Sequence, residues 1–241
     1  MLKGAPSGRR HKLWLVTGEQ SSVRYPPCEQ ALENRLDVDV REARTREERE
    51  RVFRFRYRFE PKTPERIRRY ADQRSERIQD DLDTSAGNLF ALRESELVGA
   101  IRINYAWRSA LGIHADFFRM RETAGSDHPS RSCIISRLIV DSASRGNRLG
   151  YRLCAAAYKH ALEREARIAF LCCDDRLIFY FSILGFKAYM GRTWHQEYGN
   201  VLPMKLDLHD EKYLMMIRSP LLPVLRGWKQ SKQPSVEIRP L

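Results

Sequence analysis

Apolar and polar residues alternate along this chain in two rhythms, one typical of strands and one typical of helices. Short apolar runs flanked by turn residues predict strands, and they cover residues 13–16, 38–40, 89–92, 97–103, 134–140, 168–173, 186–190 and 201–208. Apolar residues spaced three and four positions apart predict helices, and they cover residues 46–58, 65–73, 110–121, 147–165, 174–184 and 210–218. The pattern therefore predicts an α/β chain.

The segment from Thr45 to Phe59 carries both rhythms at once. Four aromatic residues between Phe53 and Phe59 alternate with arginines, which is typical of a strand. Thr45 stands three residues before Glu48, which is the spacing of a helix-capping box. The cap favours a helix, and we expect that helix to end before Pro61.

The order of the elements predicts how the sheet is built. Strand, helix, strand and helix follow one another from residue 133 to residue 185, which predicts two parallel strands joined by a right-handed crossover. Hairpins on either side add antiparallel pairs. We therefore expect a mixed, mostly antiparallel central sheet with helices on both faces, in a single domain over residues 37–228. Residues 1–36 are expected to form a loose arm, and residues 229–241 a polar tail.

Composition narrows the class of protein. The chain has 241 residues, of which 42% are hydrophobic, enough for one sizeable core. No apolar run is long enough to cross a membrane or to serve as a signal peptide, so we expect a cytoplasmic protein. The net charge of +12 predicts an acidic partner, which can be nucleic acid, anionic lipid, a CoA-like phosphate donor or an acidic carrier protein. The five cysteines and six histidines have no metal-ligand spacing, so we expect reduced thiols, no metal and no permanently bound cofactor.

A basic turn follows the strand that ends at Val140. It holds Arg145, Gly146, Asn147, Arg148, Leu149 and Gly150, and a helix begins there. The first N–H groups of a helix have no partner inside it, and the positive end of the helix dipole lies at the same place. The two arginines add charged donors. This arrangement is typical of a phosphate-binding turn, so we expect a phosphate-bearing donor to bind here.

The segment from Cys133 to Phe186 resembles the donor-binding core of the GNAT acyltransferase superfamily. The loop of that superfamily reads Arg/Gln-x-x-Gly-x-Gly/Ala; Arg145 and Gly150 fit it, whereas Arg148 stands where glycine is usual. Leu184-Gly185-Phe186 matches the end of the second helix of that core.

This resemblance also has implications for the donor. It implies that backbone groups of Leu138, Ile139 and Val140 bind the pantetheine arm. The tyrosine general acid of the superfamily does not carry over directly, because its position is Phe181, with Tyr180 adjacent.

A closer resemblance, from about Val38 to Leu225, is to the N-acyl amino acid synthases, which are relatives of the acyl-homoserine lactone synthases. That family has an arginine-aromatic helix, an Asp-x-x-Asp step, a Gly-x-x-Arg strand and a Ser-Arg strand. Here these features are Phe53–Phe59, Asp80 with Asp83, Gly99 with Arg102, and Ser136 with Arg137. The resemblance implies a fatty acyl donor on acyl carrier protein and an amino-acid-like acceptor, and the positive charge of the chain suits an acidic carrier.

Two departures argue against lactone formation. Lactone synthases carry a glutamate, a candidate base, two residues before Ser-Arg, where this chain has Ile134. The tryptophan that follows their first helix is absent near Phe59. The base that deprotonates the amine therefore cannot be named from the sequence.

Arg102 and Arg137 are expected on neighbouring strands. A buried arginine is rarely unpaired, so one interpretation is a structural ion pair with Asp80 or Asp83. The other is that either arginine binds the acceptor carboxylate while the aspartates orient it; both can hold together. Ser136 is a candidate donor to the developing oxyanion, which makes Ser136, Arg137 and Arg102 the candidate catalytic residues.

We therefore expect an acyltransferase that moves an acyl group from acyl carrier protein or acyl-CoA to the amine of an amino-acid-like acceptor. One alternative is an acetyl-CoA-dependent N-acetyltransferase acting on a small amine; an apolar tunnel lined by Phe117, Phe118 and Phe170 would favour the fatty acyl donor instead. A second alternative is a non-enzymatic nucleic-acid-binding protein, because residues 41–77 hold thirteen arginines, interleaved with aromatic residues, against eight acidic residues. Nucleic acid is the less favoured partner, since the core needs the same aromatic residues.

Overall fold

The computed structural model of the chain describes residues 38–59, 70–109, 111–144 and 148–232. The chain divides after residue 35 into two units, and all described residues belong to the second. The expected arm at residues 1–36, with its strand at 13–16, lies outside the described residues. The same is true of Arg145, Gly146 and Asn147 in the basic turn.

The described strands form an eight-stranded sheet and a separate two-stranded hairpin, β2–β3. The sheet has the order β1-β4-β5-β6-β7-β10-β8, and β9 pairs with β10. β6 and β7 are parallel, whereas the other described pairs are antiparallel, which confirms the expected mixed, mostly antiparallel sheet. The bounds are Val38–Glu42 (β1), Ala71–Asp72 (β2), Arg77–Ile78 (β3), Gly87–Arg93 (β4), Glu96–Tyr105 (β5), Ser132–Val140 (β6), Ile168–Cys173 (β7), Lys187–Ala188 (β8), Thr193–His195 (β9) and Gly199–Asp207 (β10).

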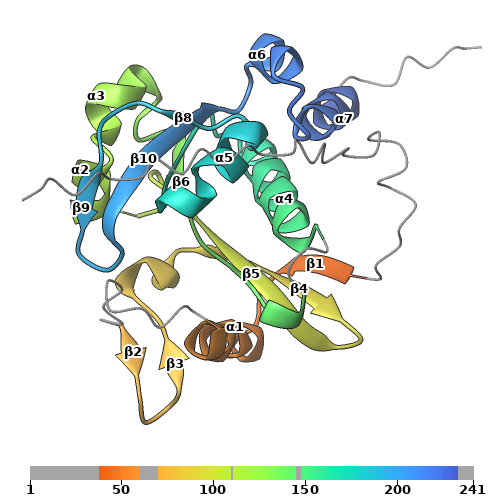
Figure 1. The fold of residues 1–241 in the computed structure, drawn as a ribbon. Helices are drawn as coiled ribbons and strands as arrows, with labels where there is room; N and C mark the ends of the chain where they lie inside the picture. The colour runs from red at the N-terminus through yellow and green to blue at the C-terminus, as the bar shows by residue number, and fades with distance from the viewer. Residues whose placement is uncertain (1–37, 60–69, 110, 145–147, 233–241) are drawn as a thin grey trace, which may run out of the picture. The chain divides into compact units, whose positions relative to one another are not determined.

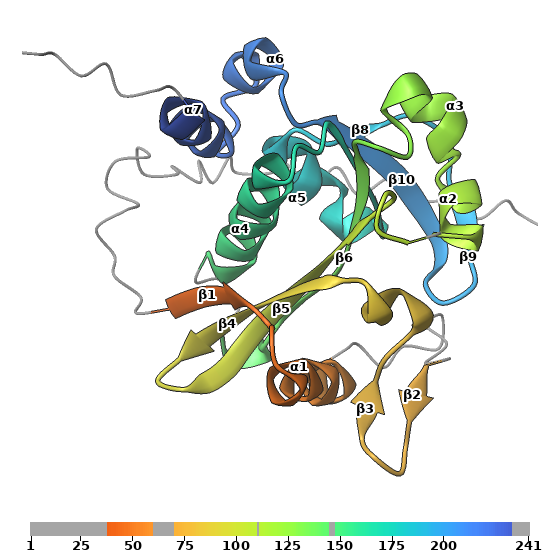
Figure 2. The ribbon, with the colours of Figure 1, turned by 180° about the vertical axis from the view of Figure 1, so that it is seen from behind.

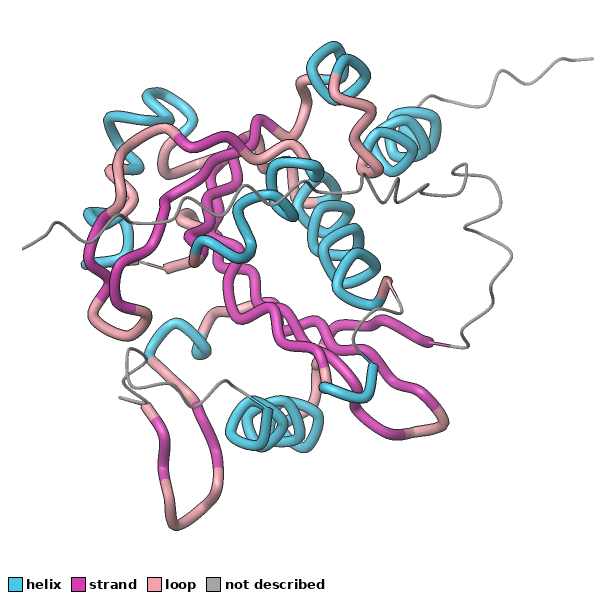
Figure 3. The backbone as a smooth tube through the Cα atoms, viewed as in Figure 1, coloured by secondary structure: helices cyan, strands magenta, loops and turns pink. Residues whose placement is uncertain are grey.

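Helices cover both faces of this sheet, as expected (Figure 1, Figure 2). Helix α1 packs on one face, while α4 and α5 cover the other and α7 packs on α4. Figure 3 shows the strands, in magenta, between the two groups of helices. The helices are Arg46–Phe59 (α1), Ile113–Phe117 (α2), Met120–Ala124 (α3), Leu149–Glu163 (α4), Asp175–Leu184 (α5), Glu211–Met216 (α6) and Leu222–Lys232 (α7).

The capping box at the start of α1 is confirmed. The N–H of Glu48 donates to Thr45 Oγ1 at 3.1 Å, and the carboxylate of Glu48 accepts from the N–H of Thr45 at 3.2 Å. Phe53 and Phe55 are buried, so the helical spacing describes this segment and the strand-like alternation does not. Because these two rings are covered, they cannot stack on bases, which weakens the nucleic-acid alternative.

The helix expected at residues 65–73 is wrong where the structure describes it. Residues 65–69 lie outside the described residues, and Ala71–Asp72 is strand β2, which pairs with β3. The carboxylate of Asp72 accepts hydrogen bonds from the N–H groups of Arg74 at 2.9 Å and Ser75 at 3.3 Å. Aspartate side chains that bond to the following backbone favour turns over helices.

Other elements differ from expectation in detail. The helix expected at 110–121 is divided into α2 and α3, because Arg119 between them has a left-handed backbone with φ of 44°. The last expected helix, 210–218, is the shorter α6. Helix α7 and strand β9 were not expected, and α7 extends into the segment expected to be a polar tail.

Gly99 determines how closely α4 packs on β5. A Cβ at this position would lie 2.8 Å from Leu153 Cδ1 and 3.3 Å from the carbonyl oxygen of Ile139. We expect Gly99→Ala to lower the free energy of unfolding, measured by urea titration, by about 1–3 kcal/mol, the usual cost of overpacking. Gly191→Ala is the control, because nothing lies within 4 Å of its added Cβ. Equal stability of the two variants would contradict this close packing.

Candidate functional site

The parallel strands β6 and β7 pair over a short stretch and then part. Their pairing covers Ser132–Ile134 of β6 and Ile168–Phe170 of β7, although both strands continue beyond it. β6 stays paired with β5 along most of its length, through a bulge at Arg137, whose backbone is left-handed with φ of 52°. Within the described strands, the edge of β6 from Ile135 to Val140 that faces β7 therefore has no strand partner.

Leu138, Ile139 and Val140, the residues expected to bind the donor arm, lie on this edge. The side chain of Ile139 packs in the core beneath α1, so the strand is held in place from that face. Backbone N–H and C=O groups require partners. An extended ligand that carries amide groups can supply them, in the way that an added strand would.

The end of the basic turn that the structure describes leads directly into α4. Arg148 precedes the helix in a left-handed conformation, with φ of 55°, and is exposed, whereas Leu149 is buried. A Cβ on Gly150 would lie 3.2 Å from the hydroxyl of Tyr180, so the helix start approaches α5 closely there. The hydroxyl of Tyr180 donates to Cys154 Sγ at 3.7 Å, and burial raises its pKa.

The Asp-x-x-Asp step is a local cap that also forms ion pairs. Asp80 caps a short 3₁₀ helix, Asp81–Thr84, and Asp83 lies within it; each of the two carboxylates accepts a backbone N–H at 3.0 Å. Asp83 accepts from Arg56 Nη1 at 2.8 Å and 2.9 Å and lies 3.2 Å from Arg102 Nη1. Asp80 accepts from the same Arg102 nitrogen at 2.5 Å. The turn therefore holds two buried carboxylates against two buried guanidinium groups.

Arg137 extends this network towards the β9–β10 turn. Its Nη2 donates to Asp80 at 2.7 Å and to the two carboxylate oxygens of Glu197 at 3.0 Å and 3.1 Å. The buried network thus balances three guanidinium groups with three carboxylates, those of Arg56, Arg102, Arg137, Asp80, Asp83 and Glu197. Arg56 and Glu197 were not expected here.

Ser136 lies opposite Arg102 on the neighbouring strand, so the two predicted residues meet. The Nε–H of Arg102 donates to Ser136 Oγ at 3.1 Å. Because the hydroxyl oxygen accepts this hydrogen bond, the hydroxyl proton is available to another acceptor. Both interpretations of the arginines are compatible with this geometry: the ion pairs are present, and they orient Arg102 towards a half-buried hydroxyl.

The network predicts acid sensitivity. Burial alone would raise the pKa values of Asp80 and Asp83. The guanidinium groups nearby outweigh burial and lower both pKa values below their ordinary value of 3.8. These groups belong to Arg102 and Arg137 for Asp80, and to Arg56 and Arg102 for Asp83. The unfolded chain therefore takes up these protons at higher pH than the folded protein. We expect the free energy of unfolding, followed by urea titration, to fall as the pH drops below about 5. Stability that stays constant down to about pH 3 would contradict this prediction.

Three of the four described cysteines are not suited to nucleophilic catalysis. Cys133, Cys154 and Cys173 are buried thiols outside any disulfide bond. Burial raises the pKa of each of these three, to about 12 for Cys154 and about 11 for Cys173. A thiol is nucleophilic as its thiolate, so a covalent acyl-cysteine at these positions is disfavoured. Cys28 lies outside the described residues.

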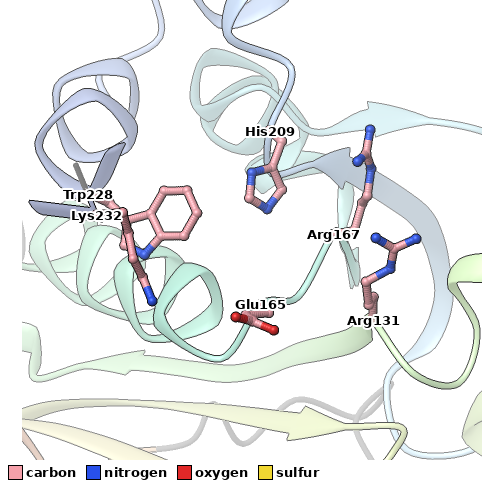
Figure 4. Close-up of a pocket in the computed structure, with 6 residues that line it drawn as sticks. All are labelled: Arg131, Glu165, Arg167, His209, Trp228 and Lys232. Carbon is pink, nitrogen blue, oxygen red and sulfur yellow. The ribbon is translucent and has the colours of Figure 1, made fainter. Parts of the chain in front are cut away.

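A pocket of about 400 Å³ lies at the other end of α4 (Figure 4). It is lined by Arg131, Glu165, Arg167, His209, Trp228 and Lys232. The pocket and the basic turn lie at opposite ends of β6 and of α4. Arg131 precedes β6 and Glu165 follows α4, whereas the turn joins the end of β6 to the start of α4. A helix of 15 residues is roughly 22 Å long. The pocket is therefore separate from the parted strands and the turn.

Comparisons with solved structures place the fold. FeeM, an N-acyl amino acid synthase from uncultured soil microbes, superposes with a TM-score of 0.56 at 14% identity, over 75% of this chain and 97% of FeeM. BjaI, a CoA-dependent acyl-homoserine lactone synthase, superposes with a TM-score of 0.53 at 18% identity, over 75% of this chain and 90% of BjaI. MesI, another CoA-dependent acyl-homoserine lactone synthase, superposes with a TM-score of 0.53 at 15% identity, over 79% of this chain and 91% of MesI. At such low identities these likenesses show a shared fold.

Sequence comparisons identify the family. No curated protein matches the sequence. In the part of the chain that the structure describes, no helix combines the length and apolar character needed to span a membrane. The profile of the acetyltransferase (GNAT) family matches residues 44–186, more than half of the chain, and this span includes the parted strands and most of the buried network. The chain therefore belongs to the acetyltransferase (GNAT) family and is an acyltransferase with the GNAT fold.

Proposed function

We propose that this enzyme transfers an acyl group from a thioester donor, acyl carrier protein or acyl-CoA, to the amine of an amino-acid-like acceptor. One observation carries the proposal: the unpaired edge of β6 adjoins the buried network on a single strand, through Ser136 and Arg137. A donor site and a site for a charged acceptor thus meet at the bulge.

The donor side rests on the shape of the sheet. In this proposal the pantetheine arm pairs with the backbone of Leu138, Ile139 and Val140, and its phosphate lies at the turn formed by Arg145, Gly146, Asn147, Arg148, Leu149 and Gly150. The unpaired edge supports the first contact, and the exposed Arg148 at the start of α4 supports the second.

The acceptor side rests on the network. Three guanidinium groups are held at fixed positions by carboxylates, Asp80 and Asp83 among them. We infer that Arg102 or Arg137 binds the carboxylate of the acceptor, because a guanidinium group matches the geometry of a carboxylate. The aspartates then orient these arginines.

The chain is compatible with either kind of donor. Its net charge of +12 and the exposed arginines of α1, among them Arg46, Arg49 and Arg54, suit an acidic carrier protein. Two of the proteins with a similar fold are described as CoA-dependent, which favours acyl-CoA. We place the reaction in the cytoplasm, where both thioesters are made.

The acyl chain would reach residues that now form a packed core. Phe118 and Phe170 are buried and lie 5.9 Å apart between ring centroids, and Phe117 meets Phe118 at 4.9 Å. These three rings pack against one another rather than around a tunnel. Binding of a long acyl chain therefore requires the rings to move apart, whereas binding of an acetyl group does not require this movement.

The chemistry proceeds by direct attack. The neutral amine attacks the thioester carbonyl carbon, the C–N bond forms, and the C–S bond breaks to release the donor thiolate. The nitrogen loses one proton, and the thiolate takes up one proton to become the free thiol. Ser136 and nearby backbone N–H groups stabilise the oxyanion that develops on the carbonyl oxygen. The binding of both substrates at the bulge supplies orientation.

Mass spectrometry of lipid extracts from cells that express the protein tests this function. We expect N-acyl amino acids that are absent from cells without the protein and strongly reduced with the Ser136→Ala variant. Robust acetyl-CoA turnover on small amines, without any N-acyl amino acid, would replace this proposal with an N-acetyltransferase.

A further inference from the structure

Two histidines lie beside the buried network, His114 on α2 and His195 on β9. These elements lie side by side in both ribbon views (Figure 1, Figure 2), and the two ring centroids are 6.1 Å apart. Phe117 meets His195 edge-on at 4.9 Å, and Tyr198 stacks on His195 at 4.6 Å. The two imidazoles are therefore held in place by aromatic contacts and are only partly buried.

A series of ring contacts connects His195 with the point where β6 and β7 part. It runs from His195 to Phe117, from Phe117 to Phe118 at 4.9 Å, and from Phe118 to Phe170 at 5.9 Å. Phe170 is the last residue of β7 that pairs with β6. From the other side, the guanidinium carbon of Arg137 lies 6.0 Å from the ring centroid of Tyr198.

Hydrogen bonding distinguishes the two rings. Nδ1 of His195 accepts from the N–H groups of Glu197 at 3.1 Å and Tyr198 at 3.3 Å. The ring proton of neutral His195 is therefore on Nε2, and its lone pair is in use. The imidazole of His114 makes no hydrogen bond within the described residues, so its lone pair is available. The nearby carboxylates of Asp80 and Glu197 already accept hydrogen bonds from guanidinium groups.

We propose that His114 is the general base of the acyl transfer. This inference rests on the proposed function, because it concerns the same acceptor. His114 takes one proton from the acceptor ammonium group and becomes an imidazolium, and the neutral amine then attacks the thioester carbonyl. After the amide has formed, His114 releases the proton to solvent. Strand β6 offers no carboxylate as a base, because Ile134 stands where the lactone synthases have a glutamate. In this proposal a base on α2 replaces it.

The charges around His114 suit this role. The ionisable groups that act on it come from the 3₁₀ turn, β5, β6 and β9, and they are Asp80, Asp81, Arg102, Arg137 and His195. Burial and the charge of Arg102 lower the pKa of His114 below 6.5, so the ring is a neutral base at pH 7. Burial, His114 and Arg137 lower the pKa of His195 to about 4. His195 therefore stays uncharged and does not repel the proton that His114 takes up.

The pH dependence of kcat/KM for thiol release by the purified protein tests the proposal, with a donor and an acceptor that support turnover. For the wild-type protein we expect an acid limb below pH 6.5, where His114 becomes protonated. We expect His114→Gln to lower kcat/KM at neutral pH by roughly 10²–10³-fold and to abolish this limb. Its rate should recover as the pH rises towards the pKa of the amine, while the KM for the donor stays unchanged.

Matched measurements keep the outcomes distinct. His209→Gln, in the pocket at the other end of α4, should leave the pH profile unchanged. An NMR titration of the His114 ring in the wild-type protein should give the pKa of the acid limb. A folded His114→Gln variant with the wild-type rate and limb would overturn the assignment and leave the proposed function standing. A wild-type protein that releases no thiol with any donor and amine would overturn both.

Discussion

Replacing Asp83 by asparagine is expected to lower the free energy of unfolding by about 3–5 kcal/mol, because it leaves buried charge without a partner. Asp83 accepts two hydrogen bonds from Arg56 Nη1, at 2.8 Å and 2.9 Å, and lies 3.2 Å from Arg102. The side chains of Asp83 and Arg56 are 0% exposed. Asparagine has nearly the same shape, so the loss measures charge rather than packing. Urea titration at neutral pH gives the value.

An exposed ion pair provides the control for Asp83→Asn. Glu163 lies 3.8 Å from Lys159 on the surface of α4, and the two side chains are 48% and 64% exposed. Glu163→Gln removes the same charge but should cost less than about 1 kcal/mol, because water screens the pair. If Asp83→Asn costs no more than Glu163→Gln, the buried network does not hold the site together.

Replacing Ser136 by alanine is expected to lower kcat by roughly 10²–10³-fold, the usual effect of removing one donor to an oxyanion. The hydroxyl oxygen accepts from Arg102 Nε at 3.1 Å, which leaves the hydroxyl proton for the substrate. The interaction exists only when charge develops on the carbonyl oxygen, so the KM for the donor should change little. Steady-state kinetics of thiol release measure both quantities.

Ser85→Ala is the matched control for Ser136→Ala. Ser85 and Ser109 share a partly buried hydrogen bond at 2.6 Å, which involves no residue of the buried network. Both substitutions remove one hydroxyl, but only Ser136→Ala should slow turnover. Thermal unfolding of the two variants separates a catalytic loss from a loss of folded protein. A Ser136→Ala enzyme with wild-type kcat would exclude the hydroxyl from the chemistry.

The features that the sequence predicted correctly depend on neighbours along the chain. The capping box of Thr45 and Glu48 starts α1 where its spacing indicates. Gly185 ends α5 with φ of 114°, a conformation that glycine adopts without strain. Asp80 and Asp83, which the family resemblance singled out, are held by the hydrogen bonds of one short 3₁₀ helix. In each case the cause lies within a few residues.

The features that were missed depend on the folded sheet. Glu197 meets Arg137 across 60 positions of the sequence, and no spacing rule connects a turn between two late strands with an earlier bulge. Arg56 is one of thirteen arginines between residues 41 and 77, and only the direction of α1 buries it. No spacing in the sequence pointed to His114, because the groups that surround it come from the distant strands β5, β6 and β9.

The most direct test of the central claim is the product of the purified enzyme. The protein is incubated with an isotope-labelled acyl thioester and a mixture of amino acids, and mass spectrometry quantifies the labelled amide and the free thiol together. The account predicts an N-acyl amino acid formed in equal amount to the thiol released. Thiol released without an amide, or a label retained on a cysteine of the protein, would contradict direct transfer at the bulge of β6.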